Sequence, residues 1–224
     1  MDAHKAIRLA GILLLAGMVT GIFSVAPAID APDYLTSAAK ASNQVILAAV
    51  FQLMMSLTYI GVAILLYPTI KRFGNSLAAG FLSCRILAAS LSITGTIVML
   101  TILAVSQAYS QNIQQAPLAL ETLGSVLKVS RDYINHAFMV IVLCTGNCLF
   151  YILCFRAKLI PRWLSVWGMA GAFLSMSASI LLLFQKVDVI TYAYLSLNAP
   201  TAIQEVVLGI WLIIKGLGKR ELLP

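Results

Sequence analysis

The sequence predicts an all-α protein whose single domain, residues 1–224, crosses a membrane as a bundle of six helices. Hydrophobic residues make up 61% of the chain and charged residues only 10%. A soluble domain of 224 residues cannot keep that much apolar surface from water. The apolar residues form six stretches, each about long enough for a helix to cross roughly 30 Å of hydrocarbon.

The basic residues predict how the chain is oriented. Of the 15 Lys and Arg residues, ten lie in four clusters in alternate loops. These clusters are Lys5 and Arg8; Lys71 and Arg72; Arg156, Lys158 and Arg162; and Lys215, Lys219 and Arg220. The opposite loops hold only Lys40, Lys128, Arg131 and Lys186. Loops rich in Lys and Arg stay in the cytoplasm, so we expect both termini to be cytoplasmic.

The six spans follow the apolar runs in order. We expect them at about 7–29, 43–67, 77–109, 132–155, 163–184 and 199–216. The first run continues without a convincing cleavage site, so it is a retained span and not a signal peptide. The second ends at Pro68, because proline disrupts a helix interior. The third is longer than a bilayer requires, and we expect it to tilt or to project outward.

The outer segment 110–131 is the longest predicted loop, and it has helical features of its own. Pro117 stands where a helix would start, and Leu120, Leu123 and Leu127 recur at helical spacing. We therefore expect a short surface helix within this loop.

Two charged residues fall inside predicted spans. Arg85 lies roughly 12 Å into the third span, and Glu205 lies roughly 9 Å into the sixth from the opposite side. A lone Arg in mid-membrane costs about 2.5–3.5 kcal/mol on insertion scales, so it needs a partner, and Glu205 is the natural candidate. One interpretation is a binding site for an anion or a proton. The other is a structural ion pair, or an Arg85 side chain that snorkels to the interface.

Four further polar residues are candidates for ligand contacts. Gln52 in the second span suits either a ligand or a hydrogen bond between helices. Asn147, Asp132 and His136 lie along the fourth span. Asp132 and His136 are one turn apart, which suits acid–base chemistry at the outer surface. The alternative is that Asp132 caps the helix and His136 lies at the headgroup level. No residue is assigned a catalytic role.

Several classes of site and partner are not predicted. All four cysteines fall inside spans, where we read them as reduced. Cys144 and Cys148 share a helix face near His136, but a fourth ligand at a recognisable spacing is missing, so we expect no metal site and no cofactor. The net charge of +7 comes from residues that flank spans and not from one basic face. We therefore expect no nucleic-acid binding.

Four stretches of the chain resemble a known family. They are Arg8–Gly21, Arg85, the Leu-Ile-Pro-Arg-Trp-Leu turn at 159–164, and Glu205–Gly216. On these residues the chain resembles the bacterial six-span membrane proteins grouped as domain of unknown function 4386. It departs modestly at 155–158, where Phe-Arg-Ala-Lys replaces a Tyr-Arg-Ser-Gly-like run. The resemblance implies a multi-pass protein of the bacterial inner (cytoplasmic) membrane, with no activity or catalytic residues to carry over.

Together these observations predict an integral membrane protein that binds or translocates a small anionic or amphipathic ligand, lipids included. The site would lie around Arg85 and Glu205. One alternative is a non-catalytic membrane adaptor or assembly factor. A second is a membrane enzyme that acts on a lipid-linked substrate. The expected partners are membrane lipids and this ligand, and a homodimer stays open.

Overall fold

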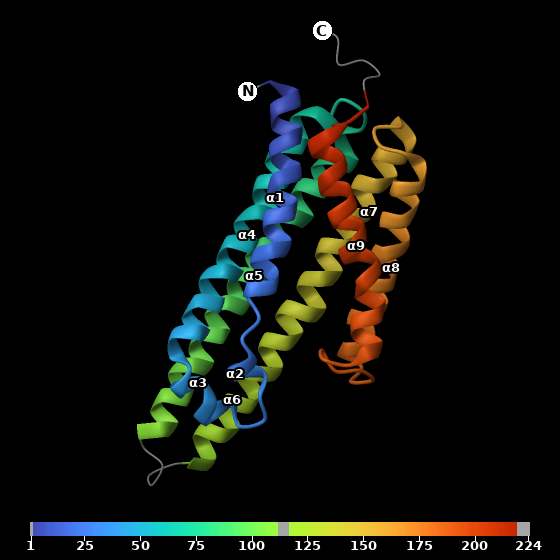
Figure 1. Ribbon diagram of the computed structural model, residues 1–224. Helices are drawn as coiled ribbons and strands as arrows, with labels where there is room; N and C mark the ends of the chain where they lie inside the picture. Colours follow the sequence, from blue (N-terminus) through green and yellow to red (C-terminus); the bar gives the residue numbers. More distant parts are fainter. Residues whose placement is uncertain (1, 112–116, 219–224) are drawn as a thin grey trace.

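The computed structural model describes residues 2–111 and 117–218, and helices joined by short turns and loops make up these parts (Figure 1). Six helices in it are long and apolar enough to cross a membrane, as the sequence predicted. The long helices are α1 (Ala3–Phe23), α4 (Ser42–Ile70), α5 (Asn75–Gln111), α7 (Met139–Ala157), α8 (Arg162–Leu183) and α9 (Tyr192–Ile214). Two short helices, α2 (Pro27–Asp30) and α3 (Tyr34–Lys40), lie between α1 and α4.

Three helix boundaries differ from the predicted ones for local reasons. Helix α1 ends at Phe23 and not near residue 29, because Pro27 starts the separate helix α2. Helix α4 continues through Pro68 for a further two residues to Ile70. Helix α9 begins near residue 192 and not near 199, because the hydroxyl of Thr191 accepts a hydrogen bond from the Tyr194 amide and caps it earlier (3.3 Å).

The helix expected in the outer loop is present, but it is not a separate surface helix. Helix α6 (Pro117–Asp132) runs directly into a π-helical segment, η1 (Tyr133–Phe138), and then into α7. It is therefore an extension of the fourth span, and it packs along the far part of α5 (Figure 1). Residues 112–116 of the expected loop lie outside the described residues.

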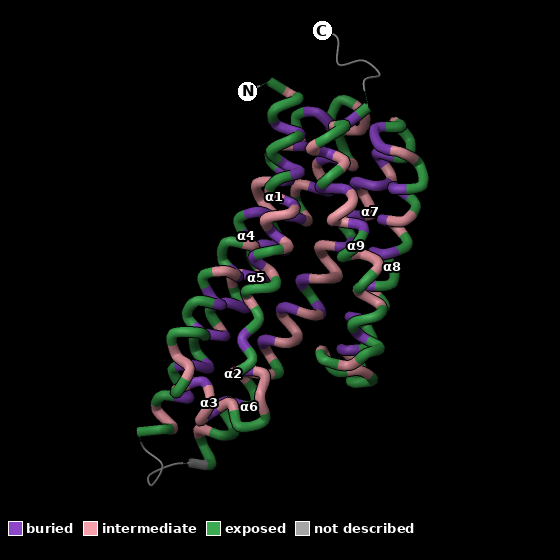
Figure 2. The backbone as a smooth tube through the Cα atoms, in the orientation of Figure 1, coloured by how far each residue is buried: buried purple, intermediate pink, exposed green. Residues whose placement is uncertain are grey.

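The six long helices form a closed ring. Each one contacts the next in the order α1, α4, α5, α7, α8 and α9, and α9 returns to contact α1. The start of α1 and the end of α9 lie at the same end of the bundle, here named the terminal end; the opposite end is the distal end (Figure 1). Buried residues face neighbouring helices while exposed ones face outward (Figure 2).

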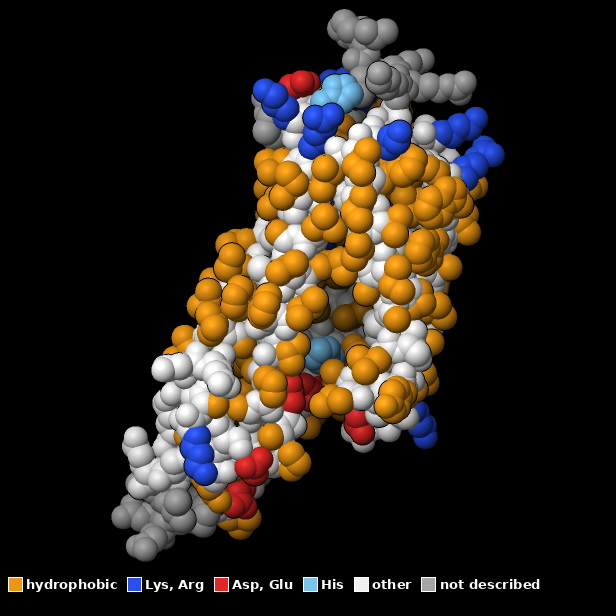
Figure 3. All heavy atoms as spheres, in the orientation of Figure 1, with side chains coloured by type: hydrophobic (Ala, Val, Ile, Leu, Met, Phe, Trp, Pro, Cys, Tyr) orange, Lys and Arg blue, Asp and Glu red, His pale blue; other side chains and the backbone are white. Residues whose placement is uncertain are grey.

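The ring closes at a contact between two glycines. A Cβ atom on Gly11 of α1 would lie 2.7 Å from the carbonyl oxygen of Gly209 on α9. No larger residue fits there without moving the backbone, so these glycines let the two helices touch. The visible face is mostly hydrophobic between the two ends, with Lys and Arg side chains gathered at the terminal end (Figure 3).

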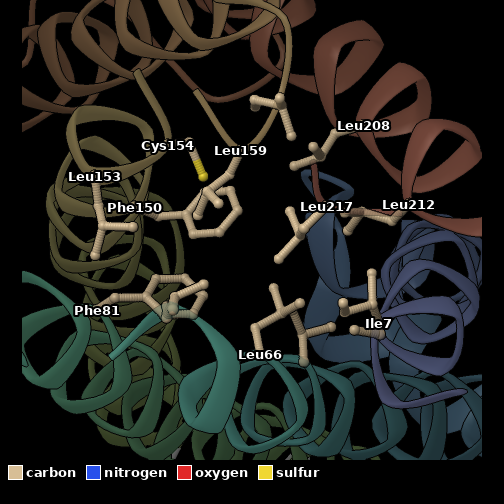
Figure 4. Close-up of a cluster of buried hydrophobic side chains, with 14 of the residues drawn as sticks. Ile7, Leu66, Phe81, Phe150, Leu153, Cys154, Leu159, Leu208, Leu212 and Leu217 are labelled. Carbon is tan, nitrogen blue, oxygen red and sulfur yellow. The ribbon is translucent and has the colours of Figure 1, made fainter. Parts of the chain in front are cut away.

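The terminal half of the ring is filled by a core of large apolar side chains, here named the plug. Its members come from α1, α4, α5, α7 and α9 and from the segments that follow α7 and α9, and they point toward one another (Figure 4). They include Ile7, Leu66, Phe81, Phe150, Leu153, Cys154, Leu159, Leu208, Leu212 and Leu217. In the described part of the chain, these side chains therefore fill the centre of the ring at this end.

Candidate functional site

Arg85 lies inside the ring on α5, next to the plug. Only 5% of its surface is exposed. Its guanidinium carbon lies 5.4 Å from the ring centre of Phe81 and 5.6 Å from that of Tyr59. Both separations are within the range of a cation–π interaction, so two aromatic rings help to hold the cation in place.

An asparagine separates Arg85 from its acidic partner. Arg85 Nη2 donates to Asn147 Oδ1 (2.8 Å), and Asn147 Nδ2 donates to Glu205 Oε1 (3.2 Å). The direct distance from Arg85 Nη2 to Glu205 Oε1 is 4.0 Å. A close Arg–carboxylate hydrogen bond is about 2.7–2.9 Å long. The two charges therefore attract each other without closing into a bonded pair.

The guanidinium keeps unused hydrogen-bonding capacity. Arg85 Nε is buried, and no described residue forms a hydrogen bond with it. Arg85 and Glu205 both line a pocket of about 170 Å³. The remaining lining residues are uncharged and come from α1 and α4: Leu14, Gly17, Met18, Gly21, Met55, Thr58, Tyr59 and Val62. This polar pocket thus places a cation and an anion together within otherwise neutral walls.

A larger cavity adjoins the polar pocket on its distal side. It has a volume of about 1000 Å³ and shares Gly21, Met55 and Tyr59 with the polar pocket. The visible face of the molecule is hollowed in its middle, and a histidine and acidic side chains lie in this hollow (Figure 3). We name this space the distal cavity. It gives the polar pocket a connection to the surroundings of the protein.

Charged residues lie at the rim of the distal cavity and form ion pairs there. Arg131 Nη1 lies 2.7 Å from Asp30 Oδ1 and 3.8 Å from Asp132 Oδ1. Lys128 Nζ donates to the backbone oxygens of Asp30 (3.0 Å) and Ala31 (3.1 Å). These contacts tie α6 to the segment around α2, which follows α1. They give the rim its own group of charged residues, separate from Arg85 and Glu205 in the polar pocket.

The six residues predicted as ligand contacts fall into two groups. Arg85, Asn147 and Glu205 form one connected cluster at the polar pocket. The other three, Gln52, Asp132 and His136, line the distal cavity. The structure therefore places five of the six in the lining of two adjoining pockets, with Asn147 hydrogen-bonded to Arg85 and Glu205, although sequence reasoning did not connect the two groups.

The second group, Gln52, Asp132 and His136, is less suited to acid–base chemistry than the one-turn spacing of Asp132 and His136 suggested. Gln52 Nε2 donates to the Ser92 carbonyl (3.0 Å) and to Asn135 Oδ1 (3.2 Å), so it joins helices. The structure gives no hydrogen bond between Asp132 and His136, and Asp132 pairs with Arg131 instead. The carbonyl of His136 accepts hydrogen bonds from two side chains, which fixes the π-helical segment. Among the described residues no three His, Cys, Asp or Glu side chains group to hold a metal ion.

Sequence reasoning missed two features of this site. Tyr59 was not singled out, although a tyrosine in mid-span is a polar group that needs a reason to be there. It lines both the polar pocket and the distal cavity. The second feature is the buried bond from Tyr151 Oη to Gln204 Oε1 (2.7 Å), which links α7 and α9 away from the pocket.

Comparison with known proteins gives one match. The family model described as Domain of unknown function (DUF4386) matches residues 9–216. No curated protein and no solved structure matches the chain.

Proposed function

The chain belongs to the domain of unknown function 4386 family, and we propose that it binds a small anionic or amphipathic ligand inside its helix ring. The anionic group of this ligand would contact Arg85. The observation that carries the proposal is the buried Arg85 Nε, which has no partner among the residues that the structure describes and belongs to a residue that lines the polar pocket.

The energetics of a buried arginine support a ligand over a purely structural pair. A buried ion pair offsets its desolvation only when its geometry is good and its remaining donors are bonded. Here the Arg85–Glu205 distance is 4.0 Å, and the one guanidinium hydrogen bond within the described residues goes to Asn147. An anionic group that accepts from Arg85 would supply the missing hydrogen bonds.

The shape of the ring supports access from one side. The polar pocket adjoins the distal cavity, whereas the plug fills the terminal half. A ligand would therefore enter through the distal half of the protein. Passage to the other side of the membrane would require the helices around the plug to separate. In this proposal, translocation is therefore a step that follows binding of the ligand.

We also propose an orientation and a location for the protein. The terminal end carries Lys5, Arg8, Lys71 and Arg72 on α1 and after α4, together with the basic residues between the end of α7 and the start of α8. Such an excess favours the cytoplasm. The terminal end would then face the cytoplasm of a bacterial inner membrane, and the distal cavity would open toward the outer side.

The proposal is tested by native mass spectrometry of the protein released from nanodiscs that retain lipids of its source membrane. We compare the wild type with Arg85→Ala. Wild-type protein is expected to carry a defined extra mass, and Arg85→Ala is expected to lose it. Equal retention of that mass by both proteins would contradict the proposal, and so would bare protein in both samples.

The matched control is Tyr151→Phe. This change removes a buried hydrogen bond between α7 and α9, the same two helices that the Asn147–Glu205 bond joins. It leaves the polar pocket untouched, so the control should keep the extra mass. Arg85→Lys serves as a second variant that keeps the charge in case Arg85→Ala does not fold, and it should bind more weakly than wild type because lysine lacks the planar fork.

A further inference from the structure

We infer that the head of the bound ligand is zwitterionic, with an anionic group on Arg85 and an ammonium group on Glu205. This inference rests on the proposed function and names the class of ligand for the same site. Its basis is the charge balance, the geometry and the size of the polar pocket.

The charge balance disfavours a ligand that is only an anion. Arg85 and Glu205 are the charged residues that line the polar pocket, so its two charges sum to zero. An added anion would leave two negative groups facing one cation in a space of low dielectric constant, which is costly. A head that carries one charge of each sign adds no net charge and gives each protein group an opposite partner.

Within the described residues, the geometry leaves hydrogen-bonding capacity unused on both Arg85 and Glu205. Asn147 holds Arg85 and Glu205 apart, with 4.0 Å between Arg85 Nη2 and Glu205 Oε1. Arg85 Nε has no partner, and the hydrogen bond that Glu205 accepts from the described residues uses Oε1 alone. A carboxylate oxygen only accepts and an ammonium group only donates, so Oε2 of Glu205 suits an amine.

The size of the two spaces predicts where the rest of the ligand lies. The polar pocket has about 170 Å³, whereas one water occupies roughly 30 Å³ of liquid, so it holds a small head and no long chain. The distal cavity is lined largely by apolar residues, among them Val25, Leu182, Val189, Ile190 and Leu195. An apolar chain attached to the head would lie there. Phospholipids with a primary amine have this chemistry.

The test uses nanodiscs of phosphatidylcholine that contain equal amounts of phosphatidylethanolamine and phosphatidylglycerol with the same acyl chains. Native mass spectrometry counts which lipid stays bound to the released protein. Wild type should retain phosphatidylethanolamine over phosphatidylglycerol by at least about tenfold, the value of one charge-assisted hydrogen bond. Glu205→Gln should reverse the preference, because the pocket then has a net positive charge.

Control variants separate this inference from the proposed function. Glu205→Asp keeps the charge and should keep the preference for the amine, and Tyr151→Phe should behave as wild type. Arg85→Ala should retain neither lipid. If wild type retains phosphatidylglycerol preferentially and Arg85→Ala loses it, the inference of a zwitterionic head is wrong and the proposed function stands. If Arg85→Ala retains lipid as wild type does, the proposed function itself fails.

A second arm identifies the source of the head group. Glycerophosphoethanolamine, a phosphodiester with the same zwitterionic head and no acyl chain, is added to protein in phosphatidylcholine nanodiscs. Its binding to wild type, lost in Arg85→Ala and in Glu205→Gln, would support the zwitterionic head and assign a soluble ligand. An unchanged lipid preference in Glu205→Gln would overturn the inference.

Discussion

The two halves of the helix ring are built from the same six helices, yet only one of them is filled. In the terminal half, large apolar side chains such as Leu66, Phe81 and Leu212 meet at the centre. In the distal half a cavity of about 1000 Å³ is lined by residues of several of these helices together with α2, α6 and η1. The difference teaches that an apolar composition alone does not decide whether a membrane bundle has a solid core.

The cause of the difference lies in how closely the helices approach. Helices α1 and α9 touch at Gly11 and Gly209 in the terminal half. Toward the distal end α1 stops at Phe23, while α4 and α5 continue further in the same direction (Figure 1). The distal wall also holds polar residues such as Gln52, which bond to neighbouring helices and leave the centre empty. Arg85 and Glu205 lie where the filled half meets the hollow half.

The largest expected difference between the halves is in water access. In a background with alanine at all four cysteines, Met55→Cys and Leu66→Cys place a thiol on the same helix, α4. Met55 lines the cavity and Leu66 is 1% exposed in the plug. A water-soluble maleimide should react at least about a hundredfold faster at position 55, because reaction in the plug requires local unfolding. Similar rates, measured by mass spectrometry, would mean that the plug is not closed.

The next largest effect is on stability. Leu66→Ala removes side-chain contacts in the plug and should lower the free energy of unfolding by about 2–5 kcal/mol. Leu195→Ala makes the same change at the wall of the distal cavity, where 53% of the residue is exposed, and should cost less than about 1.5 kcal/mol. Thermal unfolding in one detergent compares the two. Equal losses of stability would remove the distinction between the halves.

The smallest expected effect concerns glycines on α1. A Cβ on Gly11 would lie 2.7 Å from a backbone oxygen, whereas a Cβ on Gly21 would lie 3.2 Å from the flexible end of Met55. Gly11→Ala should therefore destabilise the protein by about 1–3 kcal/mol, as overpacking does. Gly21→Ala should be neutral or slightly stabilising, because alanine favours a helix. A Gly11→Ala protein as stable as wild type would show that α1 and α9 need not touch.

Much of the fold could be predicted from the sequence, because it depends on local composition. Each apolar run must form a helix, since only a helix satisfies its own backbone hydrogen bonds in hydrocarbon. The six spans follow from this rule. The helix within 110–131 followed from Pro117 and the leucine spacing, and the need of Arg85 for a partner from the cost of a charge in mid-membrane. The helix boundaries were predicted less accurately than the spans themselves. Pro68 and Pro200 lie inside helices, and the ends of those helices depend on neighbouring turns.

The tertiary structure decided what the polar residues do. Arg85 and Glu205 were paired by their depth in the membrane, but the insertion of Asn147 between them depends on how α7 packs against α5 and α9. Asp132 and His136 are one helical turn apart, yet the carboxylate of Asp132 pairs with Arg131. The sequence by itself determined six apolar helices, since length and hydropathy act within each segment. Only the packing of helices distant in sequence decided that one half is filled and the other hollow, because a cavity depends on which side chains meet.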